Sequence, residues 1–425
     1  MKFQDINSQT TENLLNRFLT YVKIHTTSDS AQADQGIIPS TKRQQVLAET
    51  LVQELKNFGI TDISITENSY VCARIPATKG MEKVPAVGFL AHMDTTEEVS
   101  GKDVKPNVIR NYDGNIIQLN HGIVLNPAED FALTTAKGET IITTDGSTLL
   151  GADDKAGIAI IMTAIELLTQ KDSEGNPIHP HGTVEILFSP DEETGHGMDK
   201  VPLEWFTAKQ CYTVDGGAAP EIETECFNAW KSEIHFTGKS LHTGAARPNM
   251  VNAITLASEF VAFLPRQESP ETTDGYQGFF APMEIQGHIE TADVTLFLRD
   301  FETEGMERRK KLVEDLANIV CKKNPGSSVT VKHTQQYLNM KEKISKNPLV
   351  IANLEKAVRQ TGLEPKFIPI RGGTDGSRLT ELGIPCPNIF TGGHNFHSRY
   401  EWASLTQMVF GVATLLNLIA LQTDN

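Results

Sequence analysis

The stretch "PAVGFLAHMDTT" (residues 85–96) begins as an apolar β-strand and ends in polar side chains. Val87 and Phe89 favour a buried strand, whereas His92 and Asp94 have no packing role at its end. In an open α/β sheet, ligands bind beyond the carboxyl ends of the strands. The position of this histidine and this aspartate therefore indicates a binding site at the edge of such a sheet.

Acidic side chains follow two further predicted strands. "TVEILFSP" runs into "DEETG", and "QCYTV" ends at an aspartate, so three strands deliver polar side chains to the same edge. These acids are Asp191, Glu192 and Glu193 after the first strand and Asp215 after the second.

Two other segments add ligand-type residues. "LLGADDKAG" places Asp153 and Asp154 before a long helix, and "GGHNFHSRYEW" supplies His394 and His397. Taken singly, each group has an ordinary structural explanation: a helix cap, a charged turn or a buried core histidine. Taken together, adjacent carboxyl groups beside an apolar strand would repel one another unless a cation lies among them.

The ligand types also restrict the metal. Histidine and carboxylate without cysteine favour zinc, cobalt or manganese, while calcium would take oxygen ligands only. One carboxylate shared by two ions would let five protein ligands hold both, and a pair of metals suits hydrolytic chemistry.

Helices and strands alternate through the first half of the chain, which is typical of an α/β domain with a largely parallel sheet. A helix is expected over 155–170 and another over 40–59, with Ser40 as its N-cap. A helix, a short strand and a final helix follow from about Asn347. The strands are expected over 62–66, 70–75, 85–92, 183–189 and 210–215.

Between these parts the pattern changes to strand–helix–strand–strand–helix–strand, which predicts a small two-layer α+β sandwich. At 425 residues the chain exceeds the size at which one core stops growing, so two domains are expected. We expect a discontinuous first domain over 1–222 and 335–425, with the sandwich inserted over 223–334.

Composition limits the partners and the compartment. The formal charge of −16 argues against nucleic acid or an anionic membrane as partner. No stretch is apolar enough for a membrane span and the first residues do not resemble a signal peptide, so a cytoplasmic protein is expected. Five scattered cysteines without a CxxC pair agree with reduced thiols.

The motifs "HMDTT", "GADDKAG", "DEETG", "TVDGG" and "GGHNFHSRYEW" resemble, in order and spacing, the co-catalytic zinc exopeptidases and deacylases. That family includes glutamate carboxypeptidase and succinyl-diaminopimelate desuccinylase. "TTDGSTLLGADDKAGIA", "SPDEETGHG", "NMVNAITLA" and "RGGTDGSRLTELGIPCPN" resemble in particular its members that cleave tripeptides. The resemblance implies a zinc-exopeptidase-like catalytic domain of class α/β and an inserted domain that acts as lid and dimerisation domain.

The resemblance also implies a role for each ligand-type residue. Two Zn²⁺ per chain, with Co²⁺ or Mn²⁺ as possible substitutes, would share Asp153. His92 and Asp215 would complete one ion, and Glu193 and His397 the other. Asp94 would accept the second ring N–H of His92, and Glu192 would be the general base. A cis peptide bond is implied between Asp153 and Asp154.

Three further regions bear on the substrate. His242 in "GKSLHTGAARPNMVNA" matches the family's lid motif and would stabilise the oxyanion, in relatives often from the other subunit of a homodimer. Arg299 would bind a substrate carboxylate, unless Asp300 or Glu302 pairs with it. Arg371 and Asp375, in "RGGTDG", would lie beside the peptide, although a plain turn explains that loop equally well. The segment 120–138 matches none of these motifs.

The expected function is therefore a dizinc aminopeptidase that releases the N-terminal residue of tripeptides. The small peptide would be its partner, together with a second copy of the chain. Two alternatives remain open: a deacylase or carboxypeptidase acting on N-acyl amino acids or dipeptides, and a zinc-binding protein without catalysis.

Overall fold

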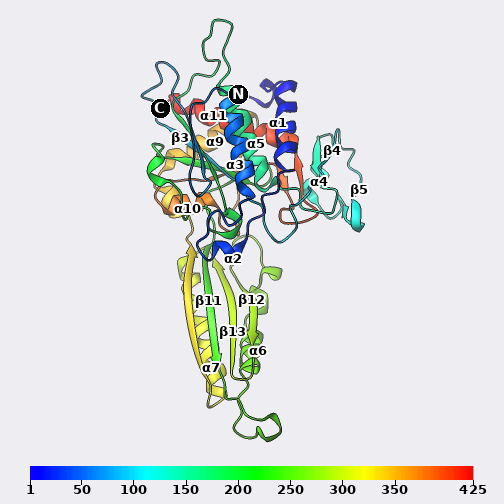
Figure 1. The fold of residues 1–425 in the computed structure, drawn as a ribbon, viewed down its shortest axis with the longest axis vertical. Coiled ribbons are helices and arrows are strands. Elements are labelled where there is room, and N and C mark those ends of the chain that lie inside the picture. The colour runs from blue at the N-terminus through cyan, green and yellow to red at the C-terminus, as the bar shows by residue number, and fades with distance from the viewer. Residues whose placement is uncertain (425) are drawn as a thin grey trace. The chain divides into compact units, whose positions relative to one another are not determined.

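A computed structural model describes residues 1–424, and the chain forms two compact units (Figure 1). Unit 1 comprises Met1–Thr224, Glu342–Ile368 and Thr374–Asn425, and unit 2 comprises Glu225–Lys341 and Pro369–Gly373. The first boundary lies near the expected residue 222. The chain returns to unit 1 later than the expected residue 335, and the short stretch 369–373 groups with unit 2.

Unit 1 is built on an eight-stranded mixed sheet in the order β1-β2-β8-β3-β9-β16-β10-β15. Its centre is parallel, because β3 pairs in parallel with β8 and β9, and β16 does so with β9. This confirms the predicted α/β class with a mixed, largely parallel sheet. The strands are β1 Asp62–Ile65, β2 Val71–Ile75, β3 Val87–His92, β8 Val184–Ser189, β9 Cys211–Gly216, β10 Glu221–Glu223, β15 Lys366–Phe367 and β16 Asn388–Phe390.

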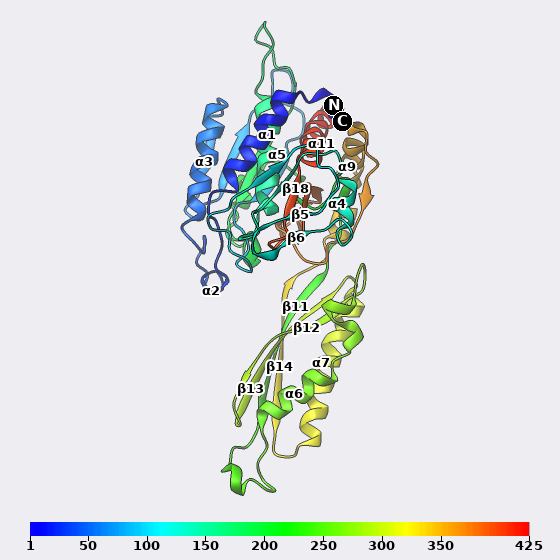
Figure 2. The ribbon, with the colours of Figure 1, turned by 90° about the vertical axis from the view of Figure 1, so that its right-hand side faces the viewer.

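Helices cover both faces of this sheet. Successive side chains of a strand point to opposite faces, and Phe89 belongs to one apolar cluster while its neighbour Leu90 belongs to another. Helix α5 packs on β3 and β9, with α1 and α11 against it and α9 against α11 (Figures 1 and 2). The helices are α1 Ser8–Tyr21, α2 Ser30–Ala33, α3 Gln44–Asn57, α5 Ala152–Leu168, α8 Lys341–Ser345, α9 Pro348–Thr361, α10 Asp375–Glu381 and α11 Leu405–Leu421.

The predicted cap of the helix at 40–59 is wrong. Helix α3 begins only at Gln44, with Arg43 in the capping position. The Ser40 hydroxyl instead donates to Asp191 Oδ1 at 2.5 Å, and the Ser40 N–H donates to Asp191 Oδ2 at 2.6 Å. A buried acceptor from a distant loop therefore takes the hydroxyl that the sequence pattern had placed at the helix end.

A second, four-stranded sheet in unit 1 joins the segment before α5 to the segment before α11. Its order is β17-β18-β7-β4, and a β5-β6 hairpin and helix α4 accompany it (Figure 2). The buried Trp402 packs there with Leu125 and Leu133. The elements are β4 Asn107–Ile109, β5 Ile117–Gln118, β6 Val124–Leu125, α4 Phe131–Thr135, β7 Ile141–Thr143, β17 Gly393–His394 and β18 Trp402–Ser404.

Unit 2 is an antiparallel sheet with two helices, in the predicted order strand–helix–strand–strand–helix–strand. The sheet order is β12-β13-β11-β14, so β12 is an edge strand. Apolar side chains of the sheet and both helices form its core. The elements are β11 Asn228–Thr237, α6 Ala253–Phe263, β12 Phe279–Gly287, β13 Thr291–Asp300, α7 Thr303–Lys323 and β14 Ser328–Tyr337.

Across residues 1–424, none of the helices is both long enough and apolar enough to span a bilayer. The five cysteines within this range form no disulfide with one another.

Candidate metal centre

The carboxyl ends of three neighbouring parallel strands meet at one edge of the main sheet. His92 is the last residue of β3 and pairs in register with Ser189, the last residue of β8. Asp94 follows β3, the turn after β8 carries Glu192, and Asp215 lies at the end of β9. The sheet therefore gathers the polar side chains at the edge that the sequence indicated.

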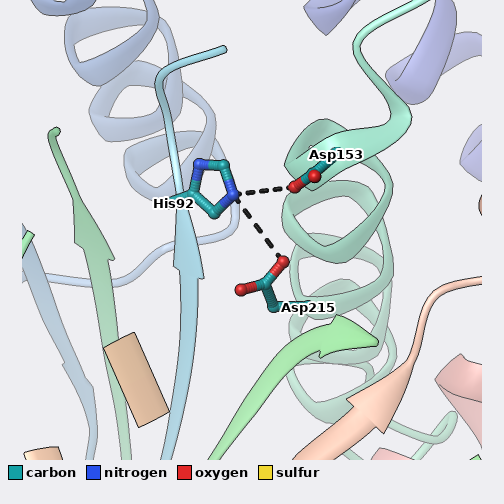
Figure 3. A group of neighbouring side chains, drawn as sticks. All are labelled: His92, Asp153 and Asp215. Carbon is teal, nitrogen blue, oxygen red and sulfur yellow. Dashed lines mark hydrogen bonds and ion pairs between the residues drawn. The ribbon is translucent and has the colours of Figure 1, made fainter. Parts of the chain in front are cut away.

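Two of these side chains, His92 and Asp215, form a first ligand group with Asp153 at the start of α5 (Figure 3). The Nε2 atom of His92 lies 2.9 Å from Asp153 Oδ1 and 3.6 Å from Asp215 Oδ1. The three ligand atoms all lie within 4.8 Å of one another. One cation fits among them.

A second ligand group uses the other oxygen of Asp153. The Nε2 atom of His397 lies 3.3 Å from Asp153 Oδ2 and 2.8 Å from Glu193 Oε2. These atoms also lie within 4.8 Å of one another. The structure thus brings together all five predicted ligands in two groups of three, with Asp153 common to both, and this donor set fits two ions joined by one carboxylate.

The loop that carries Asp153 is held by a buried carboxylate from the far end of the chain. Glu401, which is only 1% exposed, accepts four backbone hydrogen bonds of 2.6–3.3 Å. Gly151 has a left-handed φ of 81°, and the Asp153–Asp154 peptide bond is cis, as the resemblance implied. The four donors are the N–H groups of Leu150, Gly151, Ala152 and Asp153.

Asp154 is not in either ligand group. Its Oδ2 accepts the backbone N–H of His92 at 3.2 Å, and its Oδ1 accepts the N–H of Gly157 at 3.1 Å. Burial raises the pKa of Asp154 well above its ordinary value, and the nearby Asp215 carboxylate raises it further. Asp154 therefore ties the start of α5 to the end of β3.

Asp94 orients both strand ends. Its Oδ1 and Oδ2 accept the backbone N–H groups of Glu192 and Glu193 at 3.0 and 3.2 Å. The Nδ1 atom of His92 lies 3.3 Å from Asp94 Oδ1. One carboxylate thus fixes the turn after β8 and faces the ring nitrogen of His92 that points away from Asp153.

Glu192 lies beside the cluster without belonging to a ligand group. Its Oε2 is 3.9 Å from His92 Nε2, and its side chain is 14% exposed. Adjacent residues therefore take different positions: Glu193 in the second group and Glu192 next to the first.

The site concentrates carboxyl groups that burial alone would leave protonated. Burial, followed by the charge of Asp153, raises the pKa of Glu193 to about 8. Burial also raises the pKa of Asp215 to about 6, although His92 acts to lower it. Burial also acts to raise the pKa of Asp153, but hydrogen bonds from His397 and His92 hold it below its ordinary value. A cation among these groups would relieve their mutual repulsion, which is the charge argument that the sequence suggested.

Several predicted or candidate residues have other partners. His394 stacks on Trp402 with ring centroids 4.0 Å apart and is in neither ligand group. Asp375 is buried at the start of α10 and accepts a hydrogen bond from Ser189 Oγ at 2.5 Å. Burial raises the pKa of Asp375 to about 7.

Three predicted residues belong to unit 2. Arg371 donates to the carbonyls of Gly275 and Gln277, at 2.9 and 2.8 Å, so it ties its loop to the rest of that unit. His242 is exposed, and its Nδ1 accepts the N–H of Gly244.

Arg299, on β13, is only partly buried. Its Nη1 donates to the Leu298 and Trp230 carbonyls, and its guanidinium lies over Phe297 and Tyr337. Asp300, one of the two acids considered as its partner, pairs with Arg309 at 2.9 Å.

Residues 143–421 match the family described as "Peptidase family M20/M25/M40". The chain is 45% identical over 408 residues to Peptidase T of Clostridium perfringens (strain SM101 / Type A), which covers 96% of this chain and 98% of that protein. It is 43% identical over 410 residues to Peptidase T of Caldanaerobacter subterraneus subsp. tengcongensis, with the same coverage.

Solved structures share the fold over nearly the whole chain. The aminopeptidase PepT of Bacillus cereus ATCC 10987 has a TM-score of 0.74 and 23% identity, covering 98% of this chain and 99% of that one. A tripeptidase of Staphylococcus aureus has a TM-score of 0.75 and 21% identity, covering 99% and 100%. A dinuclear metal-binding peptidase of the M20 family from Bacillus subtilis has a TM-score of 0.65 and 14% identity, covering 98% and 99%.

Proposed function

This chain belongs to peptidase family M20/M25/M40, and we propose that it is a metal-dependent aminopeptidase that releases the N-terminal residue of tripeptides. The observation that carries the proposal is the pair of ligand groups sharing Asp153, in a chain 45% identical to a Peptidase T over almost its full length. The chain is a peptide-bond hydrolase. We infer its specificity for tripeptides from its similarity to Peptidase T.

Two Zn²⁺ ions per chain are the proposed cofactors. One would be held by His92, Asp153 and Asp215, and the other by Asp153, Glu193 and His397. Bound there, the ions would polarise the scissile carbonyl and lower the pKa of the attacking water. Nitrogen and carboxylate ligands without thiolate also accept Co²⁺ or Mn²⁺.

Glu192 is the proposed general base. It lies next to the first ligand group and is largely buried, so its carboxylate is placed to take a proton from the attacking water and return it to the leaving amine. Asp94 supports this role because it holds the backbone of Glu192 and of Glu193. Removal of either hydrogen bond would let the turn after β8 move.

Unit 2 would supply the groups that recognise the rest of the peptide. His242 is the proposed oxyanion donor and Arg299 the proposed partner of the substrate carboxylate. Arg299 uses Nη1 for backbone carbonyls, which leaves the edge formed by Nε and Nη2 for a bidentate pair. Arg371 and Asp375 are engaged within the protein, so we assign them to positioning the loop between them beside the peptide.

We further propose a homodimer formed through unit 2. Its edge strand β12 presents a free side for pairing, and two large apolar side chains on it, Met283 and Ile285, are 56% and 50% exposed. A second copy of β12 would cover both. A cytoplasmic location accords with the reduced cysteines.

A peptide panel on zinc-loaded protein tests the function. Tripeptides should exceed dipeptides, tetrapeptides, N-acetylated tripeptides and tripeptide amides in kcat/KM, because a free amine and a free carboxylate at fixed spacing are what tripeptides share. Arg299→Met should narrow the gap between a tripeptide acid and its amide. Faster cleavage of the N-acetylated peptide would favour a deacylase, and no product from any peptide would favour a non-catalytic zinc protein.

A further inference from the structure

A pocket of about 480 Å³ in unit 1 lies where two distant segments of the chain meet. One segment is the β6–α4 region, whose role the sequence leaves unassigned, and the other is the loop between β17 and β18. Asp130 joins them, since its Oδ2 accepts hydrogen bonds from Asn395 Nδ2 and Trp402 Nε1, both at 2.9 Å. Asp130 therefore ties the two segments together, and the volume of the pocket is in the range of small-ligand sites.

The pocket lies next to the second ligand group. Phe396 and Ser398, which line it, are the immediate chain neighbours of His397. Consecutive Cα atoms are about 3.8 Å apart, so the wall of the pocket begins one residue from a metal ligand. The Phe396 ring also packs over Gly393, where a Cβ would come within 2.4 Å of it.

The same glycine links the pocket to the shared ligand. A Cβ on Gly393 would lie 3.3 Å from the Cβ of Ala152, which directly precedes Asp153. Phe396 and Ala152 thus contact one small residue from two sides. Gly393 therefore lies between a lining residue of the pocket and the residue that precedes the bridging carboxylate.

The lining combines apolar walls with acidic charge. Val124, Leu125 and Phe396 supply aliphatic and aromatic surface, and Phe131 is 82% exposed beside them. The charged side chains that line the pocket are both acidic, Glu129 and Asp130. Asp130 is engaged with Asn395 and Trp402, so Glu129, which is exposed and bonded to Asn126 at 3.1 Å, is the charge available to a ligand.

We propose that this pocket receives the side chain of the substrate's N-terminal residue and favours a long side chain that ends in a cation, as in lysine or arginine. The inference rests on the proposed function. The N-terminal residue contributes the carbonyl carbon of the C–N bond that is cleaved, and its side chain is attached to the adjacent Cα. We therefore expect this side chain to enter the pocket whose wall begins one residue from His397. Apolar walls then contact the methylenes, and Glu129 pairs with the terminal charge.

Two tripeptides that differ only by a terminal ammonium group test the pocket. Lys-Gly-Gly and norleucine-Gly-Gly share a carbon chain, and the ratio of their kcat/KM values isolates the terminal ammonium. We expect the ratio to fall about fivefold in Glu129→Gln, the size of a partly exposed ion pair, and to invert in Glu129→Lys. Glu174→Gln, in an exposed turn, is the matched control and should leave the ratio unchanged.

A second variant tests the apolar walls without altering a buried group. Phe131→Ala should lower kcat/KM about fivefold for both long peptides relative to Ala-Gly-Gly, because an exposed ring that contacts the side chain is lost. Melting temperatures equal to wild type establish that each variant is folded.

Equal ratios in wild type, Glu129→Gln and Glu129→Lys would overturn the assignment. The assignment would also be overturned if the Glu129 substitutions changed only the kcat/KM ratio of Ala-Gly-Lys to Ala-Gly-norleucine, in which the charge is on the third residue. Hydrolysis of Ala-Gly-Gly to alanine and Gly-Gly by the wild-type enzyme tests the proposed function separately. If that reaction does not occur, the proposed function fails first and the pocket assignment falls with it.

Discussion

Glu401 accepts the backbone N–H of Asp153 at 3.3 Å, and the same carboxylate accepts the N–H groups of the three residues before it. The side chain that both ligand groups share is therefore carried on a loop closed around a buried anion. Burial raises the pKa of Glu401 to about 7, while the surrounding N–H donors favour its ionised form.

We expect Glu401→Gln to weaken metal binding about 10- to 100-fold, because the amide NH₂ would face N–H donors and release the loop. Competition with a chromogenic chelator measures this directly. Glu355→Gln, on the surface of α9, is the control. Unchanged metal affinity in a folded Glu401→Gln protein would show that the loop keeps its shape without the carboxylate.

The adjacent glutamates give a matched pair of variants. Glu192→Gln should retain both metals and lose at least about 10²-fold in kcat, because only proton transfer is removed. Glu193→Gln should instead lower the occupancy of one metal site. Metal content by elemental analysis, together with kcat, separates the two. A Glu192→Gln protein that lacks one metal per chain would mean that the two roles are reversed.

If His242 acts in the active site of the partner subunit, two inactive variants should regain activity when they form a heterodimer. Mixing Glu192→Gln with His242→Ala should restore part of the activity, because one of the two sites in the heterodimer then has both an intact base and an intact histidine. Activity is measured on heterodimer purified through two different tags. No recovery in that heterodimer would place His242 in its own subunit's site or outside catalysis.

His394 should make stability depend on pH. Burial lowers its pKa to about 4, so it stays neutral in the folded chain at a pH where the unfolded chain binds a proton. The unfolded state binds more protons between about pH 4 and 6.5, and stability therefore falls as the pH drops through this window, by about 1.4 kcal/mol per pH unit.

Denaturant unfolding of wild type and His394→Gln across this window measures the effect. The slope of unfolding free energy against pH should be smaller in the variant by about 1.4 kcal/mol per pH unit, which corresponds to one proton. His121→Gln, at an exposed position, should keep the wild-type slope. Equal slopes for wild type and His394→Gln would contradict the prediction.

The sequence predicted the sheet and the ligand cluster because both follow from local patterns. Strand ends are visible where apolar residues stop, and parallel strands bring their carboxyl ends together, so His92 and Asp215 were expected to meet. The order of helices and strands in unit 2 was also predicted, because apolar residues are spaced differently in its strands and in its helices.

Contacts between distant segments were not predictable in this way. Glu401 lies within a recognised motif, but nothing in one sequence shows that it turns inward onto residues 150–153. Ser40 resembled a helix cap, and only the fold reveals that Asp191 takes its hydroxyl. Strand β7 pairs with β18 near the end of the chain, and strands β4, β5, β6 and β7 are too short to give a periodic signal.

The insertion of unit 2 also sets an order of events on the ribosome. His92, Asp153 and Asp215 are all made before the inserted segment, whereas His397 and Glu401 follow it. At roughly 5–20 residues per second, some ten to forty seconds separate Asp215 from His397. A nascent chain thus has its first ligand trio well before the second can exist, and the centre is completed only when translation is nearly over.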